Sequence, residues 1–477
     1  MAANTRNRRQ NTILHPPQNP SMTTAHRTLI HNAHAILPAG ARAQSILIED
    51  DRILAIDAPE TARADRTINA EGLLLLPGVV DSHVHFRDPG LTHKESIATG
   101  SAAAAKGGVT TFIDMPNTLP PAITRELIHE KHRIAERSSA VNFGFYIAAS
   151  NDNLHELTAA ADDPLVMAIK VFIGSSTGNL LVDDQDTLER IFAETKLPIA
   201  AHCEDEPTVR RNHAERAAAA FPNGYADHTR VRDTEAAAIA TSRAIDLAAR
   251  HDHRFHVLHV STAREVPLLR DAPPHVTGEA CPHHLLLDES DYPRLGARAQ
   301  VNPALKTAAD RDALWDALRE GVIASVVTDH APHTAEEKAA PYPDSPSGLP
   351  AIENSLALML NESARGRCTI DQVVRWMCEA PAALWGMIGK GRIEEGADAD
   401  LVIVDPEARR AVRNADQATR CGWSPWDGVD LTGWPARTFV LGREVWNASD
   451  GLLPGAQGRA VRFDRERQRR EPAFAGA

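Results

Sequence analysis

The sequence has few cysteines and no apolar run long enough to span a bilayer. Five cysteines stand among 477 residues, and none of them belongs to a C-x-x-C pair. An odd number of cysteines without paired spacing argues against a disulfide framework and favours a reduced, cytoplasmic compartment. The missing apolar run argues against a transmembrane helix.

Positive charge is also in deficit. The formal net charge is −13 and the sequence pI is about 5.9. This balance argues against nucleic acid or an anionic membrane as the main partner. An anionic small-molecule substrate would need a local cationic site. The length allows one large domain and a smaller one.

The two ends of the chain differ from its middle. Residues 1–26 have no apolar periodicity, and we expect a disordered tail there. Short strand patterns separated by turn residues fill 27–77 and return at 391–450. These two regions predict one small β-sandwich domain formed by both terminal parts of the chain. Residues 451–477 are polar and arginine-rich, and we expect a poorly ordered C-terminal tail.

Residues 78–390 alternate strand and helix patterns. Helix-compatible stretches such as 94–106, 125–137, 184–194 and 234–250 separate the strands. The eight expected strands are 78–85, 109–114, 142–149, 166–173, 197–202, 255–260, 276–280 and 322–329. This alternation predicts an α/β fold, a (β/α)8 TIM-like barrel.

Two histidines close the first expected barrel strand. His83 and His85 are two positions apart, so their side chains share one face of the strand. Two imidazoles at this spacing can bind one metal ion together. Arg87 follows at the same spacing and could hold an anionic substrate beside that metal.

Four more candidate metal ligands lie toward the ends of other expected strands. They are Lys170, His202, His259 and Asp329. Catalytic groups of a TIM barrel gather where its strands end, so these side chains predict a shared metal site. Strand alternation selects His259 over His256, which would face the opposite way. The same rule prefers Asp329 to His330 and turns Cys203 into the core.

Lys170 is unusual as a neighbour of metal ions. Its ammonium group would suffer charge repulsion and desolvation there. Addition of CO2 to the neutral amine would give a carbamate, an anionic oxygen ligand that can bridge two cations. The alternative is a lysine that extends to the barrel rim or pairs with a carboxylate.

Four motifs resemble those of the dihydroorotases in the amidohydrolase superfamily, and the resemblance covers about residues 28–447. They are Asp81-Ser-His-Val-His-Phe-Arg-Asp-Pro-Gly90, Asp114-Met-Pro-Asn-Thr118, Thr328-Asp-His-Ala-Pro-His333 and Gly391-Arg-Ile-Glu-Glu-Gly-Ala-Asp-Ala-Asp-Leu401. Two segments depart from the family pattern. Asn302-Pro-Ala-Leu-Lys306 replaces the common Asn-Pro-Pro-Leu-Arg, and Glu279-Ala-Cys-Pro-His-His-Leu285 differs slightly from the usual motif.

The resemblance implies two Zn2+ ions per chain, bridged by carboxylated Lys170. The implied metal ligands are His83, His85, Lys170, His202, His259 and Asp329. The implied substrate contacts are His85, Arg87, Asn117, Asn302 and His333, with backbone contacts near Ser347 and Gly348. Structural roles stay open for these residues, because Asn117 and Asn302 adjoin prolines and are typical of turns. His333 could instead cap a loop, and Arg87 could form a solvent-facing salt bridge.

The implied reaction is the reversible hydrolysis of dihydroorotate to N-carbamoyl-L-aspartate in pyrimidine biosynthesis. A metal-bound hydroxide attacks the cyclic amide, and Asp329 transfers the proton. The resemblance also implies a homodimer and allows an association with aspartate transcarbamoylase. Two other functions stay open. A hydantoinase or allantoinase would leave Arg87 without a substrate carboxylate, and a non-catalytic dihydroorotase-like scaffold would typically have lost metal ligands.

Overall fold

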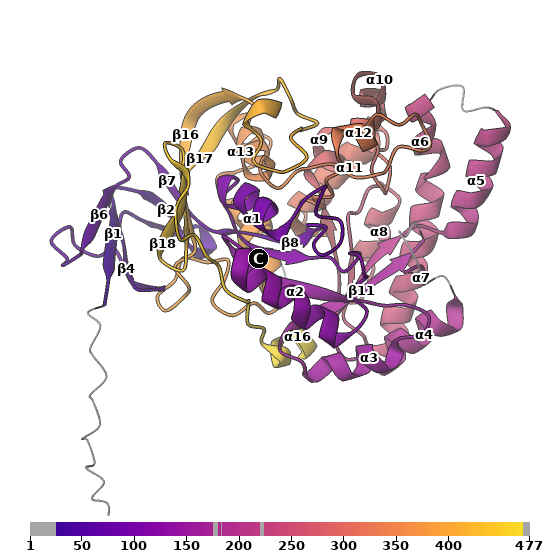
Figure 1. Cartoon of the computed structure of the whole chain (residues 1–477), viewed down its shortest axis with the longest axis horizontal. Coiled ribbons are helices and arrows are strands. Elements are labelled where there is room, and N and C mark those ends of the chain that lie inside the picture. The colour runs from indigo at the N-terminus through magenta and orange to yellow at the C-terminus, as the bar shows by residue number, and fades with distance from the viewer. Residues whose placement is uncertain (1–24, 175–179, 183, 220–223, 471–477) are drawn as a thin grey trace, which may run out of the picture.

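A computed structural model describes residues 25–174, 180–182, 184–219 and 224–470. Its centre is an eight-stranded parallel sheet in which consecutive strands are neighbours (Figure 1). The strands are β8 (Val79–Val84), β9 (Val109–Asp114), β10 (Asn142–Ala148), β11 (Val166–Ile173), β12 (Ile199–Cys203), β13 (Phe255–Val257), β14 (Val276–Ala280) and β15 (Ser325–Val326). Six of the eight expected strands are reproduced closely, whereas β13 and β15 are shorter than expected.

The first and last strands close the sheet into a barrel. Val84 forms a parallel bridge with His330, and the backbone N–H of His85 donates to the carbonyl of His330 at 2.7 Å. The carboxylate of Asp81 accepts hydrogen bonds from the backbone N–H and the hydroxyl of Thr328, at 3.1 and 2.6 Å. These contacts confirm the predicted (β/α)8 fold class. They also give Asp81 a role in joining the two closing strands.

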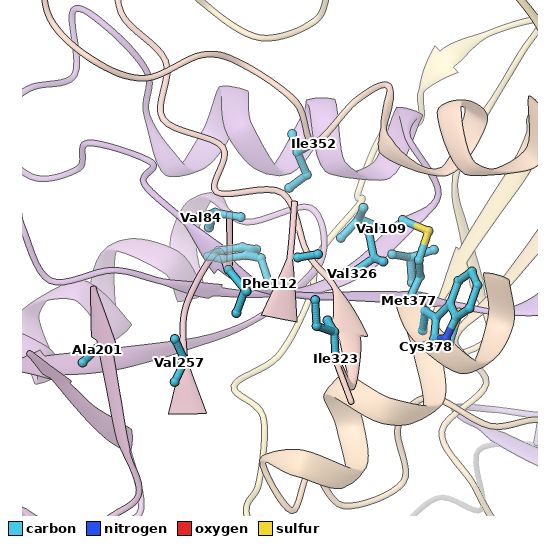
Figure 2. Close-up of a cluster of buried hydrophobic side chains, with 14 of the residues drawn as sticks. Val84, Val109, Phe112, Ala201, Val257, Ile323, Val326, Ile352, Met377 and Cys378 are labelled. Atoms are coloured by element: carbon cyan, nitrogen blue, oxygen red, sulfur yellow. The ribbon is translucent and has the colours of Figure 1, made fainter. Parts of the chain in front are cut away.

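Helices surround the barrel, and apolar side chains fill the space between strands and helices. The outward-facing residues Phe112, Val257 and Val326 belong to this buried layer (Figure 2). The main surrounding helices are α1 (Ile97–Lys106), α2 (Arg125–Ser138), α3 (Leu154–Ala159), α4 (Gln185–Glu194), α5 (Glu206–Ala218), α6 (Asp227–Val231), α7 (Thr234–His251), α8 (Glu265–Arg270) and α11 (Ala308–Arg319). The other helices of this region are α9 (Pro282–Leu286), α10 (Tyr292–Leu295), α12 (Ala335–Lys338), α13 (Ser355–Ala364), α14 (Ile370–Val374) and α15 (Ala380–Leu384).

Strands from both terminal regions form two further sheets beside the barrel (Figure 1). The first is β1 (Arg27–His31), β4 (Ile46–Glu49), β5 (Arg52–Ile56) and β6 (Arg66–Asn69); the second is β2 (His34–Ile36), β3 (Arg42–Ala43), β7 (Leu74–Pro77), β16 (Leu401–Ala411), β17 (Asp430–Val440), β18 (Arg443–Asn447) and β19 (Gly451–Leu452). β7 and β16 pair antiparallel, so the expected β domain does combine the two ends of the chain. We keep its boundaries, 27–77 and 391–450 around a barrel at 78–390, as a proposal.

The described part of the C-terminal tail is more ordered than we expected. Val461 donates its backbone N–H to the carbonyl of Phe143 at 2.8 Å, and Phe463 forms a bridge with Met387. Both Val461 and Phe463 pack into a cluster with inward-facing barrel residues, and α16 (Arg465–Arg470) follows. The expectation of a loose tail from residue 451 was therefore wrong up to residue 470, because Val461 and Phe463 pack against buried residues of the barrel. The expected N-terminal tail lies outside the described residues up to residue 24.

Two further observations concern the helices and the cysteines. None of the described helices is long and apolar enough to cross a membrane. All five cysteines are free thiols, and four of them are buried.

Candidate active site

One cavity of about 250 Å³ opens where the barrel strands end. It brings together every site residue predicted from the sequence, namely His83, His85, Arg87, Asn117, Lys170, His202, His259, Asn302, Asp329, His333, Ser347 and Gly348. Phe172, Ala331 and Pro346 complete its lining. Residues almost 270 positions apart in the chain thus share one small space, as the barrel topology requires.

The candidate metal ligands form a buried cluster at the base of this cavity. Asp329 Oδ1 lies 3.0 Å from His85 Nε2 and 3.2 Å from His83 Nε2. His202 Nδ1 lies 3.0 Å from His259 Nε2. The ring centroids of His83 and His259 are 5.3 Å apart, which joins the two pairs.

The opposite ring nitrogens of three histidines are held by oxygen acceptors. His83 Nδ1 lies 2.6 Å from Glu279 Oε1, and His85 Nδ1 lies 2.6 Å from Asn117 Oδ1. His202 Nε2 lies 2.8 Å from Glu204 Oε2. An oxygen acceptor fixes the proton on the nitrogen that faces it, so each ring turns its other nitrogen toward the cluster as a lone pair.

This arrangement fits cations. The neutral ring of His85 would turn a lone pair toward the Asp329 carboxylate, unless positive charge lay between the two groups. Ligand atoms of His83, His85 and Asp329 all lie within 4.8 Å of one another. Although burial opposes protonation, Asp329 and Glu279 raise the pKa of His83 to about 9. The base of the cavity therefore favours positive charge, and its nitrogen and oxygen donors suit a divalent metal.

Lys170 lies on the inward face of β11 and is 1% exposed. It makes no ion pair within 4.0 Å with any described residue, although Asp329 and Glu279 act on it at longer range. Its ammonium nitrogen lies 4.5 Å from the centroid of the Phe172 ring. Burial lowers the pKa of Lys170 to about 8, so a larger fraction of the amine is neutral near neutral pH than in a surface lysine.

The other end of the cavity is cationic. Lys94 Nζ lies 3.2 Å from His333 Nδ1, and the carbonyl of Ser347 lies 3.0 Å from His333 Nε2. An ammonium group can only donate, so His333 accepts at Nδ1 and carries its proton at Nε2, which donates to Ser347. Burial, followed by the charge of Arg87, holds the pKa of His333 far below its usual value, so the ring is neutral.

Arg87 points into this cationic end. Its Nε donates to the carbonyl of Pro332 at 3.2 Å, and its Nη2 lies 3.2 Å from the protonated Nε2 of His333. The side chain is buried, yet no carboxylate of the described residues lies within ion-pair distance. The solvent-facing salt bridge that we considered for Arg87 is therefore wrong. A buried guanidinium without a protein counter-ion is a strong candidate for binding an anion.

Backbone and amide groups complete the cavity wall. Asn302 contributes from the loop before α11, and its Oδ1 lies 3.0 Å from His228 Nε2 in α6. Gly348 has φ +132°, and a Cβ there would lie 2.4 Å from the carbonyl oxygen of Ala331. Only glycine fits this position, which brings the backbone itself to the surface of the cavity.

Sequence reasoning missed the carboxylates that support the histidines. Glu204 follows His202 by two positions, and this spacing could have revealed their common face. Glu279 is the penultimate residue of an expected strand, but only the fold places it against His83. The alternation argument was also wrong for His256, whose Nε2 lies 3.0 Å from Glu279 and therefore points into the barrel. His259 nevertheless lines the cavity, because its φ of +39° breaks the strand geometry.

The segment between residues 206 and 233, to which the sequence gave no role, supports the site from behind. Arg232 donates to Glu204, the carboxylate that holds His202. His228 donates to the carbonyl of Val301 at 2.8 Å, next to Asn302. In its described residues, this segment therefore fixes two parts of the cavity wall.

Comparisons with known proteins agree with this geometry. The sequence profile of the Amidohydrolase family matches residues 74–445. The chain belongs to this family. A protein of Halobacterium salinarum named dihydroorotase is 35% identical over 89% of this chain and 98% of its own length. The dihydroorotase of Methanothermobacter thermautotrophicus is 34% identical over 87% of this chain and 94% of its own length.

Solved structures of other amidohydrolases have the same fold. The L-hydantoinase (dihydropyrimidinase) from Arthrobacter aurescens matches with a TM-score of 0.87 and 30% identity, over 91% of this chain and 99% of its own. Dihydropyrimidinase from Brevibacillus agri matches with a TM-score of 0.85 and 27% identity, over 94% of this chain and all of its own. Sequence relatives and structural neighbours thus both belong to hydrolases of cyclic amides.

Proposed function

We propose that this amidohydrolase is a dihydroorotase, which interconverts dihydroorotate and N-carbamoyl-L-aspartate. The observation that carries this proposal is Arg87, a buried guanidinium with no carboxylate of the described residues within 4.0 Å, in the same cavity as the histidine cluster. Dihydroorotate has a cyclic amide to be cleaved and a separate carboxylate to be bound. The relatives named dihydroorotase support the same reaction.

We propose two Zn2+ ions as cofactors, held by the six candidate ligands. These are His83, His85, Lys170, His202, His259 and Asp329. Bound there, divalent cations would lower the pKa of a coordinated water to about 7 and polarise the amide carbonyl. The supporting carboxylates Glu204 and Glu279 would keep the rings oriented and increase their basicity as ligands.

We propose that Lys170 is carboxylated and bridges the two cations. The reaction joins the neutral amine nitrogen to the carbon of CO2, releases one proton and leaves an anionic carbamate. The lowered pKa of Lys170 supports this step, because CO2 adds only to the unprotonated amine. The absence of an ion-paired carboxylate near Nζ supports it as well, since a salt bridge would stabilise the ammonium form.

Asp329 is the residue that we expect to move protons. Although burial raises its pKa, His83 and His85 outweigh burial and hold that pKa well below its usual value. The carboxylate is therefore ionised and able to accept a proton from the attacking water. It can then pass the proton to the ring nitrogen that leaves when the amide bond breaks.

Arg87 and its neighbours would orient the substrate. Two parallel N–H groups of the guanidinium can bind the exocyclic carboxylate, and the amide groups of Asn117 and Asn302 face the same space. Asn117 also holds His85, so it would link substrate binding to the orientation of a metal ligand. We also propose pyrimidine biosynthesis as the pathway, the cytoplasm as the compartment, and a homodimer that can associate with aspartate transcarbamoylase as the assembly.

The test is an assay of the purified protein in both directions, before and after treatment with a chelator. We expect turnover of dihydroorotate and of N-carbamoyl-L-aspartate, loss of both after chelation, and recovery with Zn2+. Metal analysis of the same preparation is expected to give two ions per chain. Absence of turnover in either direction, in protein that contains its metal, would refute the proposal.

The structural neighbours favour one alternative, a hydantoinase or dihydropyrimidinase. Hydantoin and dihydrouracil have no exocyclic carboxylate, so their hydrolysis would leave Arg87 without an anionic partner. Turnover of either compound without turnover of dihydroorotate would establish this alternative.

A further inference from the structure

Lys338, at the end of α12, is a buried lysine that the reaction described above does not use. It is 5% exposed and lies directly behind the cavity wall. Its Nζ donates to three backbone carbonyls, those of Pro346 at 2.7 Å, Gly348 at 3.0 Å and Gln300 at 3.3 Å. No carboxylate of the described residues lies within ion-pair distance of this nitrogen.

These three hydrogen bonds join separate segments of the cavity wall. Pro346 and Gly348 belong to the loop that lines the cavity, and Gln300 precedes the lining residue Asn302. The carbonyl of Gln300 also accepts from the backbone N–H of Gly348 at 2.9 Å. One ammonium group therefore joins the two loop segments of this wall at the same point.

The position is costly for a cation. Burial, together with the charge of Arg87, lowers the pKa of Lys338 to about 7. Only Glu337 acts on it with opposite sign, and that carboxylate is already paired with Lys94 at 2.9 Å. A neutral side chain of similar shape would avoid this cost, so the retained cation calls for an explanation beyond packing.

Three basic side chains converge on the same end of the cavity, where a bound anion would favour the protonated form of Lys338. Arg87 lies on its surface, and Lys94 and Lys338 stand behind neutral His333 and the Ser347–Gly348 backbone. The candidate metal ligands lie at the opposite end, where Asp329 and Glu279 supply negative charge. The cavity is thus electrostatically polarised between the two ends that a substrate would touch.

We infer that Lys338 is a positioning residue that fixes the Ser347–Gly348 wall and selects cyclic amides with an exocyclic anionic group over neutral ones. This inference rests on the proposed function and extends it from Arg87, which touches the anion, to a second cation that acts through the wall. The two contributions are separable. The hydrogen bonds place the backbone, and the charge favours the anion in the low-dielectric wall.

Three substitutions separate these contributions. Lys338→Arg keeps the charge and the donors, Lys338→Gln keeps donors without charge, and Lys338→Met removes both. Lys390→Met is the matched control, because Lys390 is also a buried lysine but pairs with Asp398 and Asp400 beside the terminal sheets. Circular dichroism and thermal melts check that each variant folds.

The measurements are steady-state kinetics with dihydroorotate and the dissociation constant of orotate, an unreactive anionic analogue. For Lys338→Met we expect KM and the orotate dissociation constant to rise about tenfold or more, with kcat changed much less. Lys338→Gln is expected to lose most of this affinity, and Lys338→Arg to retain most of it. The affinity for uracil, which lacks the carboxylate, is expected to fall much less in every variant.

Other results would overturn the inference in part or as a whole. If Lys338→Met folds and binds orotate as the wild type does, the inference is overturned. If Lys338→Gln binds orotate as the wild type does while Lys338→Met binds it more weakly, the charge has no role. If orotate and uracil lose affinity equally, the side chain only stabilises the loop. Either result overturns the proposed selectivity for anionic substrates. If the wild type neither binds orotate nor converts dihydroorotate, the proposed function itself fails, and this inference fails with it.

Discussion

His83 Nδ1 lies 2.6 Å from Glu279 Oε1, and both side chains are almost completely buried. The carboxylate fixes the ring so that Nε2 faces Asp329 and the cavity. Glu279 also binds His256 at 3.0 Å, so it is held from a second side. Glu279 therefore fixes the orientation of His83, a candidate metal ligand, from inside the barrel.

We therefore expect Glu279→Gln to weaken zinc binding by about 10- to 100-fold, because the amide is a weaker acceptor for the ligand's N–H. Competition with a chelator of known affinity measures this change without relying on activity. Glu265→Gln is the control, since Glu265 is a buried carboxyl that binds Thr241 and Thr262 instead of a candidate ligand. Equal zinc affinity in the wild type and Glu279→Gln would remove the supporting role.

Arg87→Met tests substrate recognition. Hydrogen bonds to a charged group contribute about 1.5–3 kcal/mol, so we expect kcat/KM for dihydroorotate to fall at least 10- to 100-fold, mainly through KM. Zinc content is expected to stay unchanged. Arg190→Met, in an exposed pair on α4, provides the control. Near-normal KM in Arg87→Met would exclude this residue from the substrate site.

The carbamate on Lys170 predicts a dependence on CO2 during metal loading. After chelation, Zn2+ added in CO2-free buffer is expected to restore little activity, and added bicarbonate is expected to restore the rest. A carbamate signal from 13C-labelled bicarbonate, present in the wild type and absent in Lys170→Met, checks the assignment directly. Full reconstitution in carefully degassed, CO2-free buffer would contradict carboxylation.

His228 predicts a pH dependence of stability. Burial, followed by the charge of Arg232, lowers its pKa to about 3, so the folded protein excludes a proton that the unfolded chain binds below its usual pKa of 6.5. Stability from this group is present above pH 6.5 and is lost as the pH falls toward 3, by at most about 1.4 kcal/mol per pH unit. Urea unfolding at pH 6.5 and pH 5 is expected to show a smaller loss in His228→Gln than in the wild type. His155→Gln, which changes an exposed histidine, is expected to leave the wild-type slope intact.

The C-terminal segment can be tested at Gly458. A Cβ at this position would lie 1.9 Å from the carbonyl oxygen of Val141, so Gly458→Ala must displace the segment or the strand. We expect a loss of about 1–3 kcal/mol or more in unfolding free energy, as for other overpacked sites. Pro454→Ala, at an exposed position a few residues earlier, is the control. An unchanged melting temperature in Gly458→Ala would show that the segment does not pack as described.

Local patterns in the sequence indicated the barrel and most of its candidate metal ligands. Apolar runs of strand length alternating with helical periods indicated the barrel, and the His83–His85 spacing indicated shared ligands. These features were readable because side-chain direction on a strand depends only on its period of two. The same rule failed at His256, which faces inward as well, because the positive φ of His259 breaks the alternation and cannot be read from the sequence.

Only the tertiary structure decided which distant groups meet. Glu279 reaches His83, Arg232 reaches Glu204, and Lys338 reaches Pro346 through contacts between separate segments, and their residue types alone do not distinguish them from ordinary surface charges. The packing of Val461 and Phe463 under the barrel was hidden for the same reason. The sequence by itself determined the barrel and its candidate ligands, whereas the closure of the barrel decided the counter-charges that orient those ligands and polarise the cavity.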